Sequence, residues 1–285
     1  MQTDQDVSLS AGNHPNVETS AQLVLATTEY AGRRLTDMLL LFVALPLLAQ
    51  AIPVSKKFLP LDCEDIFKNG STHSGVYTIY PNGPELAVQV YCDMGCDEYD
   101  SHRDGKWTVI QRRMDGTVSF YRPWAQYKSG FGNITGEYWL GLETMFLLTY
   151  ANKYELRVDM EDFDGGSAYA QYSSFSIDPE SSNYRLHVSG YINGGAGECL
   201  YYQNGRDFAT FDKDYAGCAN GYAGGFWYNW WPCHTANPNG LYKWGSIGDQ
   251  YGGVMWGCWR GYSYSLKTIV MKIRRVSLEE LEGKK

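Results

Sequence analysis

Two aspartates separated by one lysine, Asp212 and Asp214, form the acidic pair with the clearest potential for chemistry in this sequence. They follow the apolar segment 208–211 and precede Cys218. Calcium takes six to eight oxygen ligands, often two carboxylates together with backbone carbonyls of a tight loop. The pair could therefore bind calcium, although only three residues separate Asp214 from Cys218 and leave few carbonyls. The alternative interpretation is that both acids are exposed turn residues.

The second candidate site is the segment from Cys218 to Tyr251, in which glycine and aromatic residues are crowded together. Aromatic rings can wall an apolar slot and backbone N–H groups can donate hydrogen bonds, so the segment could hold a ligand that has an apolar group beside a carbonyl. Further rings of this segment could extend a platform for stacking sugars. Packing around a glycine-rich core explains each ring at least as well. These rings are Trp227, Tyr228, Trp230, Trp231 and Trp244.

A catalytic site is not expected in this chain. Cys233 and His234 are adjacent, whereas a cysteine nucleophile needs a histidine brought to it in space together with a third, orienting group. The sequence also has no nucleophile elbow, no phosphate-binding Gly-Lys loop and no metalloprotease helix motif. We therefore predict a protein that is not an enzyme.

The composition indicates an ordered protein made for an oxidising compartment. The chain has 285 residues, a formal net charge of −8 and a pI near 5.2, which disfavours nonspecific nucleic-acid binding. Seven cysteines favour disulfide bonds, and an odd one invites a bond between chains. Two glycosylation sequons begin at Asn69 and Asn133, as in a secreted glycoprotein.

The N-terminal residues 1–51 are interpreted as an extension followed by a signal peptide. Arg33 and Arg34 precede the apolar run 38–49, and small residues around Ala51 suit signal-peptidase cleavage. The run is shorter than the ~20 residues that span a membrane, so no membrane span is predicted. Met38 is an alternative start of the chain. We expect a short linker at 52–60 and a charged tail at 277–285.

Residues 61–276 are predicted to form one domain dominated by short strands. A hairpin is expected from strands at 106–113 and 117–121, with Asp115 and Gly116 in its turn. Alternating apolar residues predict further strands at 154–160 and 267–276, and one helix is expected at 136–148. Most of the segment 190–261 shows neither the two-residue period of a strand nor the 3.6-residue period of a helix. A long irregular segment is typical of a functional region.

Several blocks of sequence, in a fixed order, resemble the fibrinogen-related (fibrinogen C-terminal) domain family. Together they cover essentially all of 61–276, which is far more specific than a single motif. The blocks lie at 62–63, 74–77, 90–94, 107–113, 136–142, 154–158, 264–267 and 271–275. The resemblance implies an α+β fold with a small N-terminal part, a central twisted antiparallel sheet and an irregular C-terminal part that carries ligand and calcium sites.

The resemblance also implies roles for particular residues. It pairs Cys63 with Cys92 and Cys218 with Cys233, and it assigns calcium to Asp212 and Asp214, although a further aspartate of the family pattern is missing here. In lectin-like members an acetyl pocket lies beside the calcium loop. The matching positions are Tyr222, Cys233, His234, Tyr251 and Gly252.

This chain departs from the family pattern in its cysteines and in one proline. Cys199 and Cys258 could form a third pair, which would leave Cys96 to link chains. Pro232 lowers the cost of a cis bond before it, whereas a cis bond at Cys233 would still cost roughly 3 kcal/mol. The acetyl pocket could therefore be shifted or lost.

The resemblance implies a secreted recognition protein of the extracellular space, with an innate-immune or matrix-organising role. We expect lectin-like binding of acetylated glycans, or of matrix proteins such as elastin or collagen fibres, by a homo-oligomer whose weak sites act together. The alternative is a structural or receptor-ligand protein that uses a protein-binding face and has a vestigial sugar pocket.

Overall fold

The computed structural model describes residues 58–95, 105–248 and 252–276. The predicted N-terminal extension and signal peptide (1–51), most of the linker, the tail (277–285) and Cys96 lie outside the described residues. Within the described ranges, no helix is long and apolar enough to cross a membrane.

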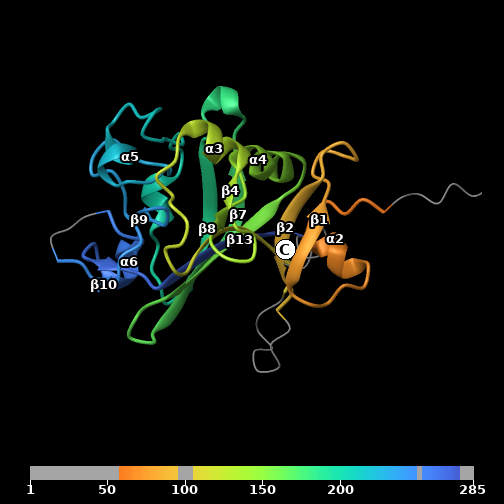
Figure 1. Ribbon diagram of the computed structural model, residues 1–285, viewed down its shortest axis with the longest axis horizontal. Helices are drawn as coiled ribbons and strands as arrows, with labels where there is room; N and C mark the ends of the chain where they lie inside the picture. Colours follow the sequence, from red (N-terminus) through yellow and green to blue (C-terminus); the bar gives the residue numbers. More distant parts are fainter. Residues whose placement is uncertain (1–57, 96–104, 249–251, 277–285) are drawn as a thin grey trace, which may run out of the picture. The chain divides into compact units, whose positions relative to one another are not determined.

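A twisted antiparallel sheet runs through the described part of the chain (Figure 1). Its strands pair in the order β1-β2-β3-β13-β6-β7-β8, so the last strand of the chain lies at the centre, between β3 and β6. The strands are β1 (Gly75–Ile79), β2 (Val88–Asp93), β3 (Trp107–Arg113), β13 (Thr268–Arg275), β6 (Tyr154–Glu161), β7 (Ser167–Ile177) and β8 (Leu186–Gly194). The fold class is therefore the predicted α+β.

The small N-terminal part consists of α2 (Cys63–Lys68) with β1 and β2. Asp62 begins the helix because its Oδ1 accepts hydrogen bonds from the backbone N–H groups of Glu64 and Asp65, at 3.1 and 3.2 Å. A disulfide bond from Cys63 to Cys92 then ties the start of the helix to β2.

β3 and β6 are buried along almost their whole length, and β13 between them is buried at half of its residues. In β6, Leu156, Val158 and Met160 form the buried face that the alternating pattern predicted, and this strand and β13 are confirmed within one residue of their predicted limits. One face of the sheet is covered by α4 (Leu142–Ala151), which packs on β7 and buries Leu142 and Met145 completely. This face of the sheet therefore packs on a hydrophobic core.

The predicted helix at 136–148 was wrong in its first half. Tyr138 and Trp139 instead form the short strand β5, which pairs with β3 and β4 (Phe131–Gly132). The helix begins only after Gly141, whose φ of 109° is not helical. A Cβ at Gly141 would lie 2.9 Å from backbone atoms of residues 128–130, so only glycine allows this close approach.

The predicted hairpin at 106–121 was also wrong, because β3 has no partner strand at 117–121. The segment after β3 folds around the buried carboxylate of Glu137 instead. That carboxylate accepts hydrogen bonds from the backbone N–H groups of Met114 at 2.9 Å and Val118 at 3.0 Å. These amides therefore serve a loop and not a strand ladder.

A cluster of aromatic rings joins the irregular C-terminal part to the sheet. Tyr127 of α3 (Trp124–Ser129) contacts Trp139, and Phe208 contacts both Trp139 and Trp227, with ring centroids 5.1–5.7 Å apart. Around this cluster, most of 195–263 is irregular, as expected. Its short elements are η3 (Leu200–Gln203), α5 (Cys218–Gly221), β9 (Ala236–Asn237), β10 (Gly245–Ser246), β11 (Met255–Trp256) and α6 (Gly257–Arg260).

Candidate functional site

The loop from Cys218 to Cys233 carries the candidate site and is closed by a disulfide bond between these residues. The loop begins with the single turn α5, which starts after Gly217 in the left-handed conformation at φ 72°. Asp214 holds this turn, since its Oδ2 accepts a hydrogen bond from Ala219 N at 2.6 Å. The start of the loop is thereby fixed against the segment that precedes it.

His234 lies at the end of this loop, with its ring against two tyrosines. The rings of His234 and Tyr222 pack edge to face, with their centroids 4.2 Å apart. The centroid of the Tyr228 ring lies 5.9 Å from that of His234. His234 is 4% exposed, and neither ring nitrogen has a hydrogen-bond partner among the described residues. Burial lowers the pKa of His234 to about 4, so the imidazole is neutral at physiological pH.

The lowered pKa of His234 predicts that the stability of the fold decreases as the pH falls. The unfolded chain takes up a proton near pH 6.5, whereas the folded chain does so only near pH 4. Lowering the pH through this window therefore favours unfolding, by about 3 kcal/mol once pH 4 is reached. His234→Phe, which keeps an aromatic ring and needs no hydrogen-bond partner, should remove this part of the pH dependence.

Denaturant titrations from pH 7 to pH 4 on the wild type and the variant measure the difference. His73→Phe, at an exposed position of the N-terminal part, is the matched control and should keep the wild-type pH dependence. If His234→Phe loses as much stability on acidification as the wild type, His234 is not buried in its neutral form.

Asn237 holds the walls of the site together. Its side-chain amide donates hydrogen bonds to the carbonyls of Tyr222 at 3.2 Å and Gly253 at 3.3 Å, and its Oδ1 accepts one from the Tyr228 hydroxyl at 2.9 Å. Gly252, at φ 94°, lies directly against the backbone of Tyr222. The site prediction missed Asn237, although a buried asparagine beside a predicted pocket is a typical positioning residue.

Four of the five predicted ligand-binding residues therefore lie close together: Tyr222, Cys233, His234 and Gly252. Tyr251 lies outside the described residues. The other aromatic residues of the region divide into two groups. Trp227 and Tyr228 are buried, whereas Trp230, Trp231 and Trp244 are more than 70% exposed. The peptide bond between Trp231 and Pro232 is cis.

The predicted calcium residues lie at the start of the same region, and both carboxylates already accept hydrogen bonds. Asp212 Oδ1 accepts from Trp124 N at 2.9 Å and from Thr210 Oγ1 at 2.6 Å. Asp214 Oδ1 accepts from Ala216 N at 3.0 Å. Within the described ranges, no three His, Cys, Asp or Glu side chains are grouped so as to hold a metal. Calcium would thus depend on two carboxylates and nearby carbonyls, and its binding stays a prediction.

The two sequon asparagines are exposed, Asn69 directly after α2 and Asn133 directly after β4. The side chain of Asn133 accepts hydrogen bonds from the backbone N–H and the hydroxyl of Thr135, at 3.1 and 2.9 Å. Both positions are therefore accessible from solvent, and their glycosylation stays a prediction.

Comparison with known proteins shows which family this chain resembles. The family described as fibrinogen beta and gamma chains, C-terminal globular domain, matches residues 59–276. Microfibril-associated glycoprotein 4 of Bos taurus is 50% identical over 226 residues, which cover 76% of this chain and 86% of the relative. Fibrinogen C domain-containing protein 1 of Mus musculus is 46% identical, over 75% of this chain and 47% of the relative.

A solved structure agrees with these sequence matches. The fibrinogen-like globe domain of human ANGPTL2 superimposes with a TM-score of 0.70 at 43% identity, and the match covers 76% of this chain and 99% of that domain. The family model, the relatives and the solved structure all match the same major part of the chain. The chain therefore belongs to the fibrinogen C-terminal domain family.

Proposed function

We propose that this protein is a secreted recognition protein that binds acetylated glycans at the site around Tyr222 and His234. The observation that carries the proposal is the meeting of a half-buried tyrosine, a neutral buried histidine and a closely packed glycine beside the disulfide bond. Neutral rings suit the methyl group of an acetamido substituent, and backbone N–H groups suit its carbonyl.

The proposed function is binding without catalysis. Cys233 shares a disulfide bond with Cys218, so it has no thiolate to act as a nucleophile. The neighbouring His234 is buried without any polar partner among the described residues, whereas a general base needs an orienting group. The arrangement thus suits recognition of a ligand.

We also propose matrix fibres as partners, with elastin or collagen as the class of protein to test. The similarity to a protein named microfibril-associated glycoprotein 4 supports this choice. Each single site is expected to be weak, and a homo-oligomer would raise the avidity by linking several sites. Calcium at Asp212 and Asp214 would fix the segment before α5, which carries one wall of the site.

Isothermal titration with N-acetylglucosamine tests the glycan proposal. Wild-type protein should bind this sugar and bind glucosamine, which lacks the acetyl group, at least about tenfold more weakly. Tyr222→Ala should weaken binding by about 1–3 kcal/mol, because it removes a wall of the site. Tyr150→Ala removes a ring that is 78% exposed on α4 and should leave the affinity unchanged.

Repeating the titration with millimolar calcium and with a chelator tests whether sugar binding depends on calcium. Calcium should tighten sugar binding and raise the melting temperature, and Asp214→Asn should abolish both effects. Unchanged binding and melting in the wild type would exclude a role for calcium. Equal affinity of Tyr222→Ala and wild type would exclude the acetamido site at this position.

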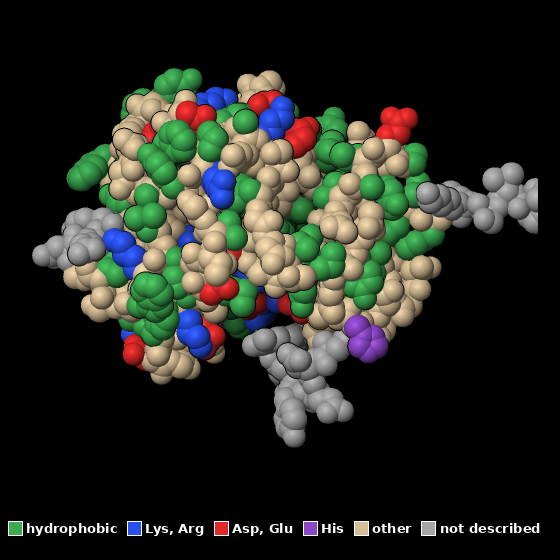
Figure 2. Space-filling view, viewed as in Figure 1, with side chains coloured by type: hydrophobic (Ala, Val, Ile, Leu, Met, Phe, Trp, Pro, Cys, Tyr) green, Lys and Arg blue, Asp and Glu red, His purple; other side chains and the backbone are tan. Residues whose placement is uncertain are grey.

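Exposed aromatic rings favour a second candidate function, that of a structural or receptor-ligand protein. Figure 2 shows hydrophobic side chains spread over the visible face, among few charged ones. Five large rings are more than 70% exposed in or near the irregular part: Tyr201, Tyr215, Trp230, Trp231 and Trp244. Binding of purified elastin or collagen fibres without any response to acetylated sugars would favour this function over the lectin-like one.

A further inference from the structure

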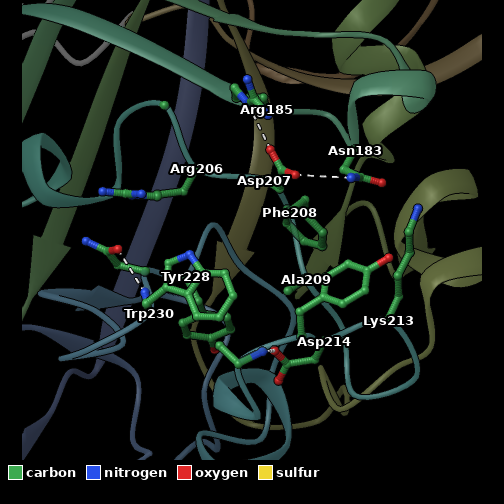
Figure 3. A pocket seen from close by; sticks show the side chains of 14 residues that line it. Asn183, Arg185, Arg206, Asp207, Phe208, Ala209, Lys213, Asp214, Tyr228 and Trp230 are labelled. Carbon is green, nitrogen blue, oxygen red and sulfur yellow. Dashed lines mark hydrogen bonds and ion pairs between the residues drawn. The ribbon is translucent and has the colours of Figure 1, made fainter.

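A cavity of about 220 Å³ lies beside Tyr228 (Figure 3). Three segments form it: the turn before β8, residues 205–209, and the disulfide loop with the residues that precede it. Tyr228 lines this cavity, and its ring also lies near His234. Two possible sites therefore share one buried tyrosine as a wall.

The two carboxylates that line this cavity are neutralised or hydrogen-bonded by the protein itself. Asp207 accepts hydrogen bonds from Arg185 Nε at 2.8 Å and from Asn183 Nδ2 at 3.1 Å, which Figure 3 shows at the upper wall. Asp214 accepts from the backbone N–H groups of Ala216 and Ala219. The Asp207 carboxylate is therefore paired with a cation of the protein, whereas Asp214 keeps its charge and holds the turn α5.

Arg206 is a cation of the cavity that no carboxylate of the described residues neutralises. Among the described residues it has no ion-pair partner, and its buried Nε has no hydrogen-bond acceptor. Its backbone is held at both ends, since its N–H donates to Gln203 O and its carbonyl accepts from Leu186 N. A planar guanidinium can donate two parallel hydrogen bonds to a carboxylate or to two oxygens of a tetrahedral sulfate, and no acceptor among the described residues occupies the Arg206 Nε.

The other lining residues complete a site for a sugar. Trp230 is 73% exposed and Tyr215 is 84% exposed, and each offers a ring face on which a sugar ring can stack. Figure 3 shows Arg206 extending along the same side of the cavity as Tyr228 and Trp230. Lys213, whose Nζ lies 3.6 Å from the Trp124 ring centroid, adds positive charge at the opposite side. Drug-sized ligands occupy about 300–1,000 Å³, so this cavity suits a single sugar ring.

We propose that this cavity is a second ligand site, which binds an acidic saccharide with its carboxylate or sulfate on Arg206 and its ring against Trp230. The site does not depend on the acetamido site. A protein with both sites could engage two different substituents of one glycan chain, which would increase selectivity without requiring a tight interaction at either site.

Titrations with three simple sugars that lack an acetyl group test this proposal. Glucuronic acid carries the carboxylate, glucose 6-sulfate carries the sulfate, and glucose carries neither. At least one acid should bind, and glucose should bind about tenfold or more weakly. The acid that binds identifies the group that Arg206 recognises. Weak binding of both acids, or equal binding of glucose, would overturn the proposal.

Variants then locate the binding. Arg206→Gln and Trp230→Ala should each weaken binding of the acidic sugar by about tenfold or more. Arg206→Gln should still bind N-acetylglucosamine as the wild type does. The matched controls are Lys68→Gln on α2 and Trp244→Ala, which remove the same charge and the same exposed ring outside the cavity. An equal loss in Lys68→Gln would show nonspecific attraction, and an unchanged affinity in Arg206→Gln would remove the site from this cavity.

Discussion

Replacing Glu137 with alanine should lower the free energy of unfolding by about 3–5 kcal/mol, because it leaves Arg113 as a buried cation without its carboxylate. Both side chains are at most 2% exposed, with Arg113 Nε 3.4 Å from Glu137 Oε1. The same carboxylate accepts hydrogen bonds from the backbone N–H groups of Met114, Asp115 and Val118. All three amides would lose their acceptor together with the ion pair.

Denaturant unfolding measures this loss, and Glu161→Ala provides the matched control. Glu161 lies 2.6 Å from Lys267, but the two side chains are 38% and 44% exposed. Solvent screens such a pair, so its removal should cost only about 0–1 kcal/mol. Similar losses in the two variants would mean that the loop after β3 does not depend on Glu137.

Removing the Cys199–Cys258 disulfide bond should lower the free energy of unfolding by about 4 kcal/mol. This is the entropy of closing a loop between residues 59 apart in sequence, which the unfolded chain regains when the bond is absent. The bond ties the segment before η3 to α6, across a part of the chain with little regular structure. The double variant Cys199→Ala/Cys258→Ala should therefore unfold at clearly lower denaturant concentration than the wild type.

The Cys218–Cys233 bond provides a comparison within the same region. It joins residues only 15 apart, so its removal should cost less, about 3 kcal/mol in the same treatment. Comparing the unfolding free energies of the two double variants tests whether these bonds stabilise the fold by restricting the unfolded chain. A cost that is larger for the shorter loop would contradict this explanation and point to packing around Cys218.

The strands at the centre of the sheet were predictable because their signal is local. Alternating apolar residues from Leu156 to Met160, and from Ile269 to Ile273, need only the two-residue period of a strand to reveal which side chains are buried. The order of the family blocks then indicated the architecture, the aspartate pair, and the residues around Tyr222 and His234. Tyr222 lies in the loop that the Cys218–Cys233 bond closes and His234 follows this loop directly, so few long-range contacts had to be known to bring these two together.

The remaining features were decided by contacts between segments far apart in the sequence. The segment after β3 forms a loop and not the expected hairpin, because the backbone N–H groups of Met114 and Val118 donate to the Glu137 carboxylate and not to a partner strand. The pKa of His234 follows from burial, which neighbouring residues in the sequence do not set. The free guanidinium of Arg206 depends on where residues 183–185 and 228–230 meet around it. A local pattern determines which face of an element is apolar, whereas only the packed chain determines which polar groups find partners.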